Sequence, residues 1–552
     1  MKKAVIFHSI ENVDDYIKRG MSNNDFLFST HSSVDIYLKE YYDKDCQCLS
    51  NFLTAEEMIC YRDDYSKTVD DSLALLDSKI APVINRQFNF KMRYFGPLYS
   101  YLGKHHFFGY FYFHETLKRA MSIYKLKRIS FYDYEFRGFI DGNSDMRYFI
   151  SSAFPDLDAE IIKQPAQGGN NHPVLARIGD LIKKVKQRPF WMIKRLTDRL
   201  SNDFIYRNLL PGKKTVLLYE YLYELEFLRK LRSKYNIIYY DFKDDNPLCF
   251  RKRNLSAPEN IDFSCLSFIE DVENPCQKVF LKDIKDDFMK NITRYVAAID
   301  NLRGINEKFP IALGVWGNSP MLKIKALVFE YLRSENIKIV GAQHGSAYGD
   351  SCVPWHFDSD FNRCDYFISY GFTEEDLKRV YPESKINCKI VSLGKTKLVD
   401  ISRSKKDIDI LFPMTVSVSV LEGGMKRIAH KLTERQVCLL EYLNSLKGVK
   451  IYVKPLPYLD SKNCSVLPVL KRLKNLKIIY NTFLMEFLDQ YNPKAVLIED
   501  PSTPLFEALS LDTEIFLMSD YIHPLEKKAF EELHLRVHYS EDTNEIIEKL
   551  DL

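Results

Sequence analysis

The stretch IVGAQHGSAYG, from Ile339 to Gly349, is the part of the sequence that best indicates the fold. An apolar run begins at Ile337 and leads into Gln343, His344 and Gly345. This is how a buried strand delivers polar groups to the edge of an α/β sheet. In open α/β sheets ligands bind outside the carboxyl ends of the strands, so the pattern places His344 where ligands bind. A loop histidine that is hydrogen-bonded only for structure is the alternative.

Strand-like and helix-like segments alternate on both sides of this stretch, which predicts an α/β fold with parallel strands. Upstream, an apolar strand from Ile311 to Trp316 is followed by Gly317 and Asn318 and then by a helix that leads back to the central strand. The resulting β-α-β unit places Gly317 and Asn318 on the same sheet edge as His344. We therefore expect these residues, with Gln343 and Gly345, to line a ligand cleft.

The chain of 552 residues is too long for one ordinary core. A polar segment, Ser402 to Lys406, is predicted to link two Rossmann-like domains in tandem. Residues 1–400 would form the first domain, interrupted at about 151–210 by a helical, basic insertion. A second series of strands and helices would form the other domain over residues 407–552.

Ser502 and Thr503 stand where a buried strand of the second domain meets a helix. Two hydroxyl groups, free backbone N–H groups and the positive end of the helix dipole together favour a phosphate site. Glu507, one turn further, is placed to accept hydrogen bonds from ribose hydroxyls. The alternative is an ordinary capped helix, with Ser502 as its N-cap and Glu507 in solvent.

Lys454 ends a neighbouring strand and is followed by Pro455, which prevents a helix from starting there. A lysine held at that point would balance the charge of a diphosphate or of a departing nucleotide. A solvated lysine is the alternative. Gly394 closes another strand, Lys389 to Leu393.

Charge and cysteine content exclude several classes of protein. The 78 Lys and Arg residues nearly balance the 75 Asp and Glu residues, so no overall field favours nucleic acid. The 11 cysteines show neither zinc-ligand spacing nor a disulfide framework, which predicts reduced thiols in the cytoplasm. The first apolar run is too short for a signal peptide, and no window is long enough to span a bilayer. We expect no metal ion and no other cofactor.

Residues 177–199 contain eight basic and two acidic residues around an aromatic and apolar group at 190–193. Such a stretch can lie on an anionic membrane surface, which would place the protein at the inner face of the membrane. The alternative is a helical hairpin whose cations are simply solvated.

Two Rossmann-like domains with a Gln-His-Gly loop in the first and a Ser-Thr-Pro-x-x-Glu turn in the second resemble the GT-B glycosyltransferase architecture. More closely, they resemble a family of transferases from bacterial surface-polysaccharide (O-antigen-type) loci. The segments that carry the resemblance are Gln343–Gly349, Ser369–Gly371, Gly394–Lys395 and Asp500–Glu507. The chain departs from the family at Ser346, where a second glycine is usual, and at Lys454-Pro455, where Tyr-Pro or His-Pro is usual.

The resemblance implies a metal-independent glycosyltransferase of surface-polysaccharide synthesis. It would move a sugar from a nucleotide donor, CMP-activated by analogy, to a glycan or lipid-linked acceptor. The nucleotide would contact the second domain, and His344 would act as general base or as a hydrogen-bonding group at the reacting centre. The residues implied in donor binding are Lys454, Ser502, Thr503, Glu507 and Gly394, and those in acceptor binding are Gln343, Gly345, Gly317 and Asn318.

Two other functions remain open at this point. Polyol-phosphate (CDP-glycerol-type) transferases carry similar Gln-His-Gly loops and would transfer a phosphodiester. A sugar- or nucleotide-binding scaffold without catalytic activity is the second alternative, and in that case His344 would be dispensable for glycan synthesis.

Overall fold

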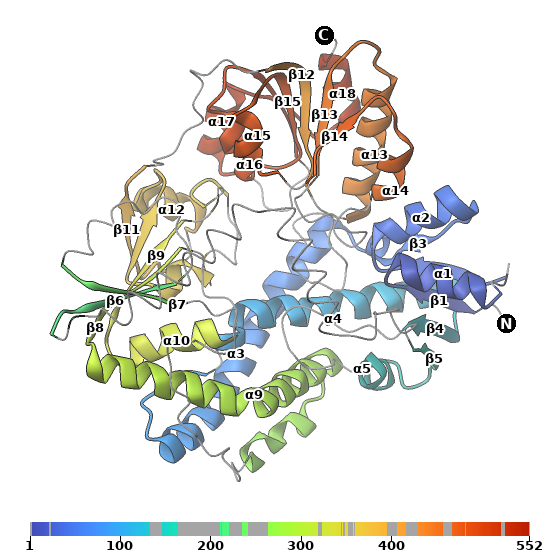
Figure 1. The fold of residues 1–552 in the computed structure, drawn as a ribbon. Helices are drawn as coiled ribbons and strands as arrows, with labels where there is room; N and C mark the ends of the chain where they lie inside the picture. The colour runs from blue at the N-terminus through green and yellow to red at the C-terminus, as the bar shows by residue number, and fades with distance from the viewer. Residues whose placement is uncertain are drawn as a thin grey trace, which may run out of the picture.

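The structure is a computed structural model that describes most of the chain. The described residues are 3–20, 22, 24–95, 97–132, 146–163, 210, 212–219, 234–240, 263–317, 323–343, 345, 348–351, 357, 359–382, 384–394, 406–415, 429–455, 466–480, 482–519 and 525–550. They form three sheets in which neighbouring strands run parallel (Figure 1). The predicted α/β class with parallel strands is therefore confirmed.

The first sheet has five strands in the order β3-β2-β1-β4-β5. Its central strand β1 (Ala4–Phe7) is buried along its whole length, as its continuous apolar sequence requires. The other elements of this part are α1 (Ile10–Lys18), β2 (Phe26–Ser29), α2 (Ser32–Tyr42), β3 (Gln47–Cys48), η1 (Leu49–Phe52), α3 (Ala55–Phe88), α4 (Pro97–Tyr124), β4 (Arg128–Tyr132), α5 (Met146–Ala153) and β5 (Asp158–Ile162).

The second sheet has six strands in the order β11-β10-β9-β8-β6-β7. The direction of winding reverses between β6 and β8, and such a switch point is the usual ligand site of an open α/β sheet. The elements are β6 (Thr215–Tyr219), β7 (Asn236–Tyr240), η2 (Ser264–Asp271), α9 (Pro275–Lys308), β8 (Ile311–Trp316), α10 (Lys323–Ser334), β9 (Lys338–Ala342), η3 (Phe361–Arg363), β10 (Tyr366–Ser369), α12 (Glu374–Val380) and β11 (Lys389–Ser392).

The third sheet has six strands in the order β14-β13-β12-β15-β16-β17. Its elements are β12 (Lys406–Pro413), α13 (Ala429–Ser445), β13 (Ile451–Lys454), α14 (Leu467–Arg472), β14 (Lys477–Ile478), α15 (Leu484–Leu488), β15 (Tyr491–Ile498), α16 (Thr503–Ala508), β16 (Glu514–Met518), α17 (Lys527–His534), β17 (His538–Ser540) and α18 (Thr543–Lys549).

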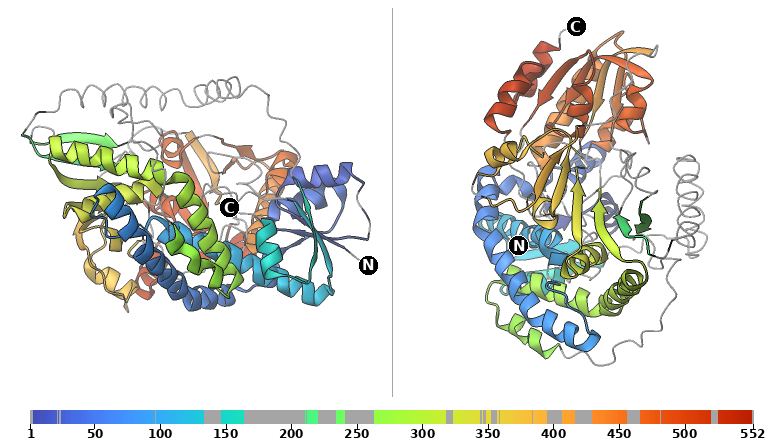
Figure 2. Two further views of the ribbon diagram at one scale, coloured as in Figure 1. Left: turned by 90° about the horizontal axis from the view of Figure 1, so that it is seen from below. Right: turned by 90° about the vertical axis from the view of Figure 1, so that its left-hand side faces the viewer.

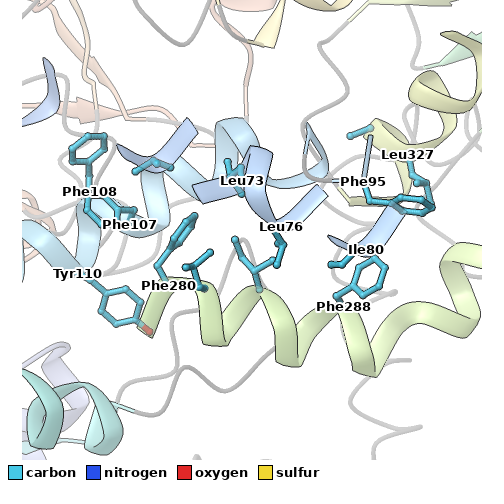
Figure 3. Packing of buried hydrophobic residues seen from close by; sticks show 14 of the residues in the cluster. Leu73, Leu76, Ile80, Phe95, Phe107, Phe108, Tyr110, Phe280, Phe288 and Leu327 are labelled. Atoms are coloured by element: carbon cyan, nitrogen blue, oxygen red, sulfur yellow. The ribbon is translucent and has the colours of Figure 1, made fainter. Parts of the chain in front are cut away.

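Long helices lie between the first and second sheets, and they form the main core (Figures 1 and 2). The side chains of α3, α4 and α9 interlock along their length (Figure 3). The rings of Phe107 and Phe280 meet edge to face at 5.8 Å, and those of Phe95 and Phe288 at 6.0 Å. Each such buried side chain contributes about 1.5–3 kcal/mol through the water it displaces.

Residues 1–400, grouped into one domain from sequence, contain two sheets. One hydrophobic cluster nevertheless extends from Ile6 in the first sheet to Phe367 in the second. The two sheets can share one core because the long helices α3, α4 and α9 bury apolar side chains near both of their ends. The boundary near residue 400 stays a prediction.

The predicted insertion at 151–210 lies largely outside the described residues. Within it, Asp158–Ile162 form strand β5 and pair in register with β4 at the edge of the first sheet. The predicted start of the insertion at residue 151 therefore lies before β5, the last strand of the first sheet. The basic stretch 177–199 lies outside the described residues.

The third sheet contacts both of the others. On one side α14 packs against α2, and Arg472 Nε lies 3.1 Å from Glu40 Oε2. On the other side the backbone N–H of Glu526 donates to the carbonyl oxygen of Asp350 at 2.7 Å. The part that carries the third sheet is thus held at two separate places (Figure 1).

Candidate active site at the junction of the second and third sheets

Gln343 fixes the way the chain leaves β9. Its backbone N–H donates to Ile368 at 2.9 Å, which continues the pairing of β9 with β10. Its buried side-chain amide donates from Nε2 to the carbonyl oxygen of Gly345 at 2.7 Å and accepts at Oε1 from the backbone N–H of Tyr370, also at 2.7 Å. The amide thereby holds the loop after β9 against the end of β10.

Gly317 lies on the same edge as Gln343, as predicted. Because Trp316 pairs with Gly341 in parallel register, the residues that follow these two strands are neighbours. The backbone N–H of Gly317 reaches the carbonyl oxygen of Tyr219 at 3.4 Å, across the switch point between β8 and β6. Lys325 from α10 lies over the ring of Tyr219, 4.5 Å from its centre. The switch point therefore carries a buried cation.

Asn318 and His344 lie outside the described residues. Their neighbours Gly317, Gln343 and Gly345 are described, and all three follow the carboxyl ends of β8 or β9. The predicted position of His344 on the sheet edge therefore rests on the residues on either side of it, and its catalytic role stays a prediction.

The Ser502–Glu507 turn starts a short helix, α16, of six residues. Ser502 is its N-cap, yet the hydroxyl of Ser502 donates to the carboxylate of Asp500 and makes no capping hydrogen bond. Thr503 is exposed. The hydroxyl group nearest the solvent is therefore that of Thr503, whereas that of Ser502 is occupied within the turn.

The two predicted motifs meet in space. A Cβ atom built on Gly345, in the loop after β9, would lie 3.4 Å from Oγ1 of Thr503. The loop of the second sheet thus comes into contact with the helix tip of the third, although the two are far apart in the sequence. This contact is the geometric basis of the candidate site.

Lys454 lies at the carboxyl end of β13 and is only 5% exposed. Burial lowers the pKa of Lys454, and the negative charges of Glu507 and Glu486 partly oppose that effect. Lys454 and Glu507 therefore share one electrostatic environment beside α16. Among the described residues, Lys454 forms no salt bridge, although Glu507 and Glu486 act on its charge.

Gly394 follows β11 with a φ of +72°, a conformation that favours glycine. A Cβ there would meet no atom within 4 Å. Strand β10 separates β11, which Gly394 follows, from β9. Its assignment to donor binding stays a prediction.

Asp350 was not identified from the sequence. The loop that contains it forms an antiparallel bridge, Ser351 with Leu525, to the part that carries the third sheet. Asp350 as a whole is partly exposed, whereas its Oδ1 atom is buried without a hydrogen-bond partner. Burial raises the pKa of this carboxyl to about 7. No local sequence pattern marks such a group, because the segment that contains it meets residues about 175 positions away in the sequence.

Within the described part of the chain, no cluster of three or more His, Cys, Asp or Glu side chains is placed to hold a metal ion. The helices of this part also include none with the length and apolar content needed to cross a membrane.

Comparison with known proteins gives one family match. The profile of a family described as "LIC12162 family transferase" matches residues 147–534. This match confirms the resemblance to a transferase family. No curated protein matches the chain.

Two solved structures show remote similarity. The crystal structure of Acinetobacter baumannii MurG is 10% identical over 61% of this chain and 89% of its own, with a TM-score of 0.29. The spinosyn rhamnosyltransferase SpnG, complexed with spinosyn aglycone, is 10% identical over 60% of this chain and 89% of its own, with a TM-score of 0.28. At these scores neither likeness carries an argument about fold or function.

Proposed function

Because the chain belongs to the LIC12162 family of transferases, we propose that it is a GT-B-type glycosyltransferase that moves a sugar from a nucleotide-sugar donor to a glycan acceptor. The contact between Gly345 and Thr503 carries this proposal. It joins the carboxyl edge of one parallel sheet to a helix tip of another, and both segments lie within the residues that the family profile matches. Transfer between two substrates needs a site that both can reach at once.

The donor would bind against the third sheet. Keeping the ammonium group of Lys454 out of water is unfavourable, and the pKa of Lys454 is lowered accordingly. The negative charge of a diphosphate or monophosphate beside Lys454 would compensate the charge of the ammonium group. The ammonium group would in turn stabilise the leaving nucleotide without a metal ion. Thr503 would donate its hydroxyl to a phosphate oxygen, and Glu507 would accept hydrogen bonds from the ribose.

The acceptor would approach from the edge of the second sheet, past Gly317 and Asn318. His344, which follows Gln343 in the loop, would remove or orient the proton of the attacking hydroxyl group. A histidine near its ordinary pKa is largely neutral at pH 7 and suits this role.

The finer assignments extend the same proposal. The donor would be a CMP-activated sugar, and the acceptor a surface polysaccharide of the O-antigen type or its lipid-linked precursor. Residues 177–199 would hold the protein at the inner face of the cytoplasmic membrane, where such precursors are assembled.

The test begins with thermal unfolding of the full chain in the presence of CMP, UDP, GDP or CDP. A nucleotide at 100 times its dissociation constant should add about 2.7 kcal/mol of stability. Lys454→Met should weaken the binding of that nucleotide about tenfold or more, equivalent to about 1.4 kcal/mol. The matched control is Lys477→Met, because Lys477 is exposed on the neighbouring strand β14. Equal effects of the two variants would contradict the donor site.

His344→Ala then separates catalysis from simple binding. Sugar transfer should fall about tenfold or more while the melting temperature stays unchanged. Full glycan synthesis with this variant would instead support the scaffold alternative. Release of CMP together with transfer of a phosphodiester, rather than of a sugar, would identify a polyol-phosphate transferase.

A further inference from the structure

The loop after β9 touches the part that carries the third sheet at both of its ends. At its start Gly345 lies against Thr503. At its other end the carbonyl oxygen of Asp350 accepts from Glu526 at 2.7 Å, and Ser351 bridges Leu525. The loop therefore crosses the junction at which, on the proposed function, donor and acceptor meet.

Asp350 belongs to this junction, and its carboxylate accepts a hydrogen bond from its own backbone N–H. Its Oδ1 atom is buried and has no hydrogen-bond partner. Leaving a buried polar atom without a partner is unfavourable and uncommon in folded proteins. The residue as a whole is partly exposed. Ionisable groups with strongly perturbed pKa values cluster at functional sites.

Among the described residues, the charged groups of this segment form no ion pair with Asp350. Glu526 follows the bridging residue Leu525 and caps α17 by accepting from the backbone N–H of Lys528 at 3.1 Å. Arg379 of α12 approaches Glu526, with its Nε atom 3.9 Å from Oε2, and it also pairs with Asp376. Neither cation nor anion of this group is bonded to the Asp350 carboxylate.

We propose that Asp350 is a catalytic residue of the transfer reaction and accepts the proton of the acceptor hydroxyl group. This inference rests on the proposed function. As the hydroxyl oxygen bonds to the anomeric carbon of the donor sugar, its O–H bond breaks and the proton passes to the carboxylate of Asp350. The bond between the anomeric carbon and the phosphate oxygen breaks at the same time, and the nucleotide leaves with that electron pair. His344 then serves as the group that hydrogen-bonds and orients the substrates.

Asp360 provides a matched control within the same sheet. Its Oδ1 atom is also buried without a partner, and burial also raises its pKa to about 7. Its Oδ2 atom accepts from the hydroxyl of Ser359 at 2.8 Å. Asp360, however, precedes η3 and the amino end of β10, whereas Asp350 follows the carboxyl end of β9. The two groups have similar environments but lie at opposite ends of their strands.

The experiment compares Asp350→Asn and Asp360→Asn in the full chain, with the donor and acceptor used by the wild-type protein. In the wild type, kcat/KM should rise with pH through about 7, because the carboxylate must be ionised to accept a proton. Asp350→Asn should lower kcat about 100-fold or more and remove that rise. Asp360→Asn should leave kcat and the pH profile within about twofold of the wild type.

A further variant covers the case in which Asp350→Asn does not fold. Asp350→Ala should be inactive, and added formate should restore part of its activity, since a small carboxylate can occupy the space of the lost side chain. An Asp350→Asn protein that folds and keeps both its rate and its pH profile overturns the inference, as does an Asp350→Ala protein that formate does not rescue. A wild-type protein that transfers no sugar from any nucleotide overturns the proposed function itself, before any variant is compared.

Discussion

Asp360 shows how one buried carboxyl group should control stability as the pH changes. Burial raises its pKa from 3.8 to about 7, so the folded protein binds this proton more tightly than the unfolded chain does. The free energy of unfolding therefore falls as the pH rises from about 4 to 7, by up to about 4 kcal/mol for three pKa units. Asp360→Asn removes this penalty. We expect the variant to gain about 1–3 kcal/mol relative to the wild type between pH 5 and pH 8.

Urea unfolding of both proteins at the two pH values measures this difference. Asp409→Asn is the control, because an ion pair with Lys494 lowers the pKa of Asp409 and keeps it ionised at both pH values. Its effect on stability should be the same at pH 5 and pH 8. If Asp360→Asn changed the free energy of unfolding equally at pH 5 and pH 8, ionisation of the Asp360 carboxyl group would not destabilise the folded protein.

The positions of candidate site residues could be predicted where the sequence pattern is local. Gln343, Gly345 and Thr503 follow strands or start a helix, and strand ends are recognisable from the change between apolar and polar residues. The role of Ser502 could not be predicted, because its hydroxyl group donates a hydrogen bond to Asp500 and does not cap the helix. Asp350 could not be predicted either, since its segment pairs with the distant residues Leu525 and Glu526.

At the scale of single elements, two glycines that look alike in the sequence should respond in opposite ways to a methyl group. Gly341 in β9 lies against the ring of Trp316, and a Cβ atom there would come within 2.4 Å of it. Gly304 in α9 has open space around it. Gly341→Ala should lower the free energy of unfolding by about 1–3 kcal/mol through overpacking. Gly304→Ala should raise it by about 0.5–1 kcal/mol through helix propensity.

Denaturant midpoints of the two variants, measured beside the wild type, check this contrast. The result for Gly341→Ala also bears on how the central stretch is interpreted. Within the stretch Ile339–Gly349, Gly341 allows close packing on Trp316, whereas Gly345 lies at the contact with Thr503. Tolerance of alanine at Gly341 would show that the ring of Trp316 can move away.

Elements themselves were predicted more reliably than their ends. The apolar run Ile337 to Val340 indicated the central strand, and β9 (Lys338–Ala342) extends two residues beyond it. The helix expected at Ser502 and Thr503 starts at Thr503, with Pro504 in its first turn. Such differences arise because strand pairing and caps, not the apolar pattern alone, decide where an element ends.

For the whole molecule, the two attachments of the third sheet limit how far its part can move. It is joined to the second sheet through Asp350 and Glu526, and to the first through α2 and α14. A hinge that closes about one attachment would have to break the other. We therefore expect small-angle X-ray scattering of the full chain to give the same radius of gyration with and without bound nucleotide. A clear decrease would mean that one attachment opens.

The number of sheets was beyond what the sequence could predict. Alternation of strands and helices indicates parallel pairing, but it does not say which strands share a sheet. β5 and β6 follow one another in the described chain, yet they belong to different sheets. That choice depends on the packing of α3, α4 and α9, whose apolar faces meet residues far away in the sequence.

Trp316 is completely buried beside Gly341, and its Nε1 atom has no hydrogen-bond partner. An indole ring in such dry surroundings emits at shorter wavelength than one in water. In a variant without Trp191 and Trp355, its fluorescence would therefore register any shift of the strand end that carries Gln343, so the chain contains an optical probe of that sheet edge.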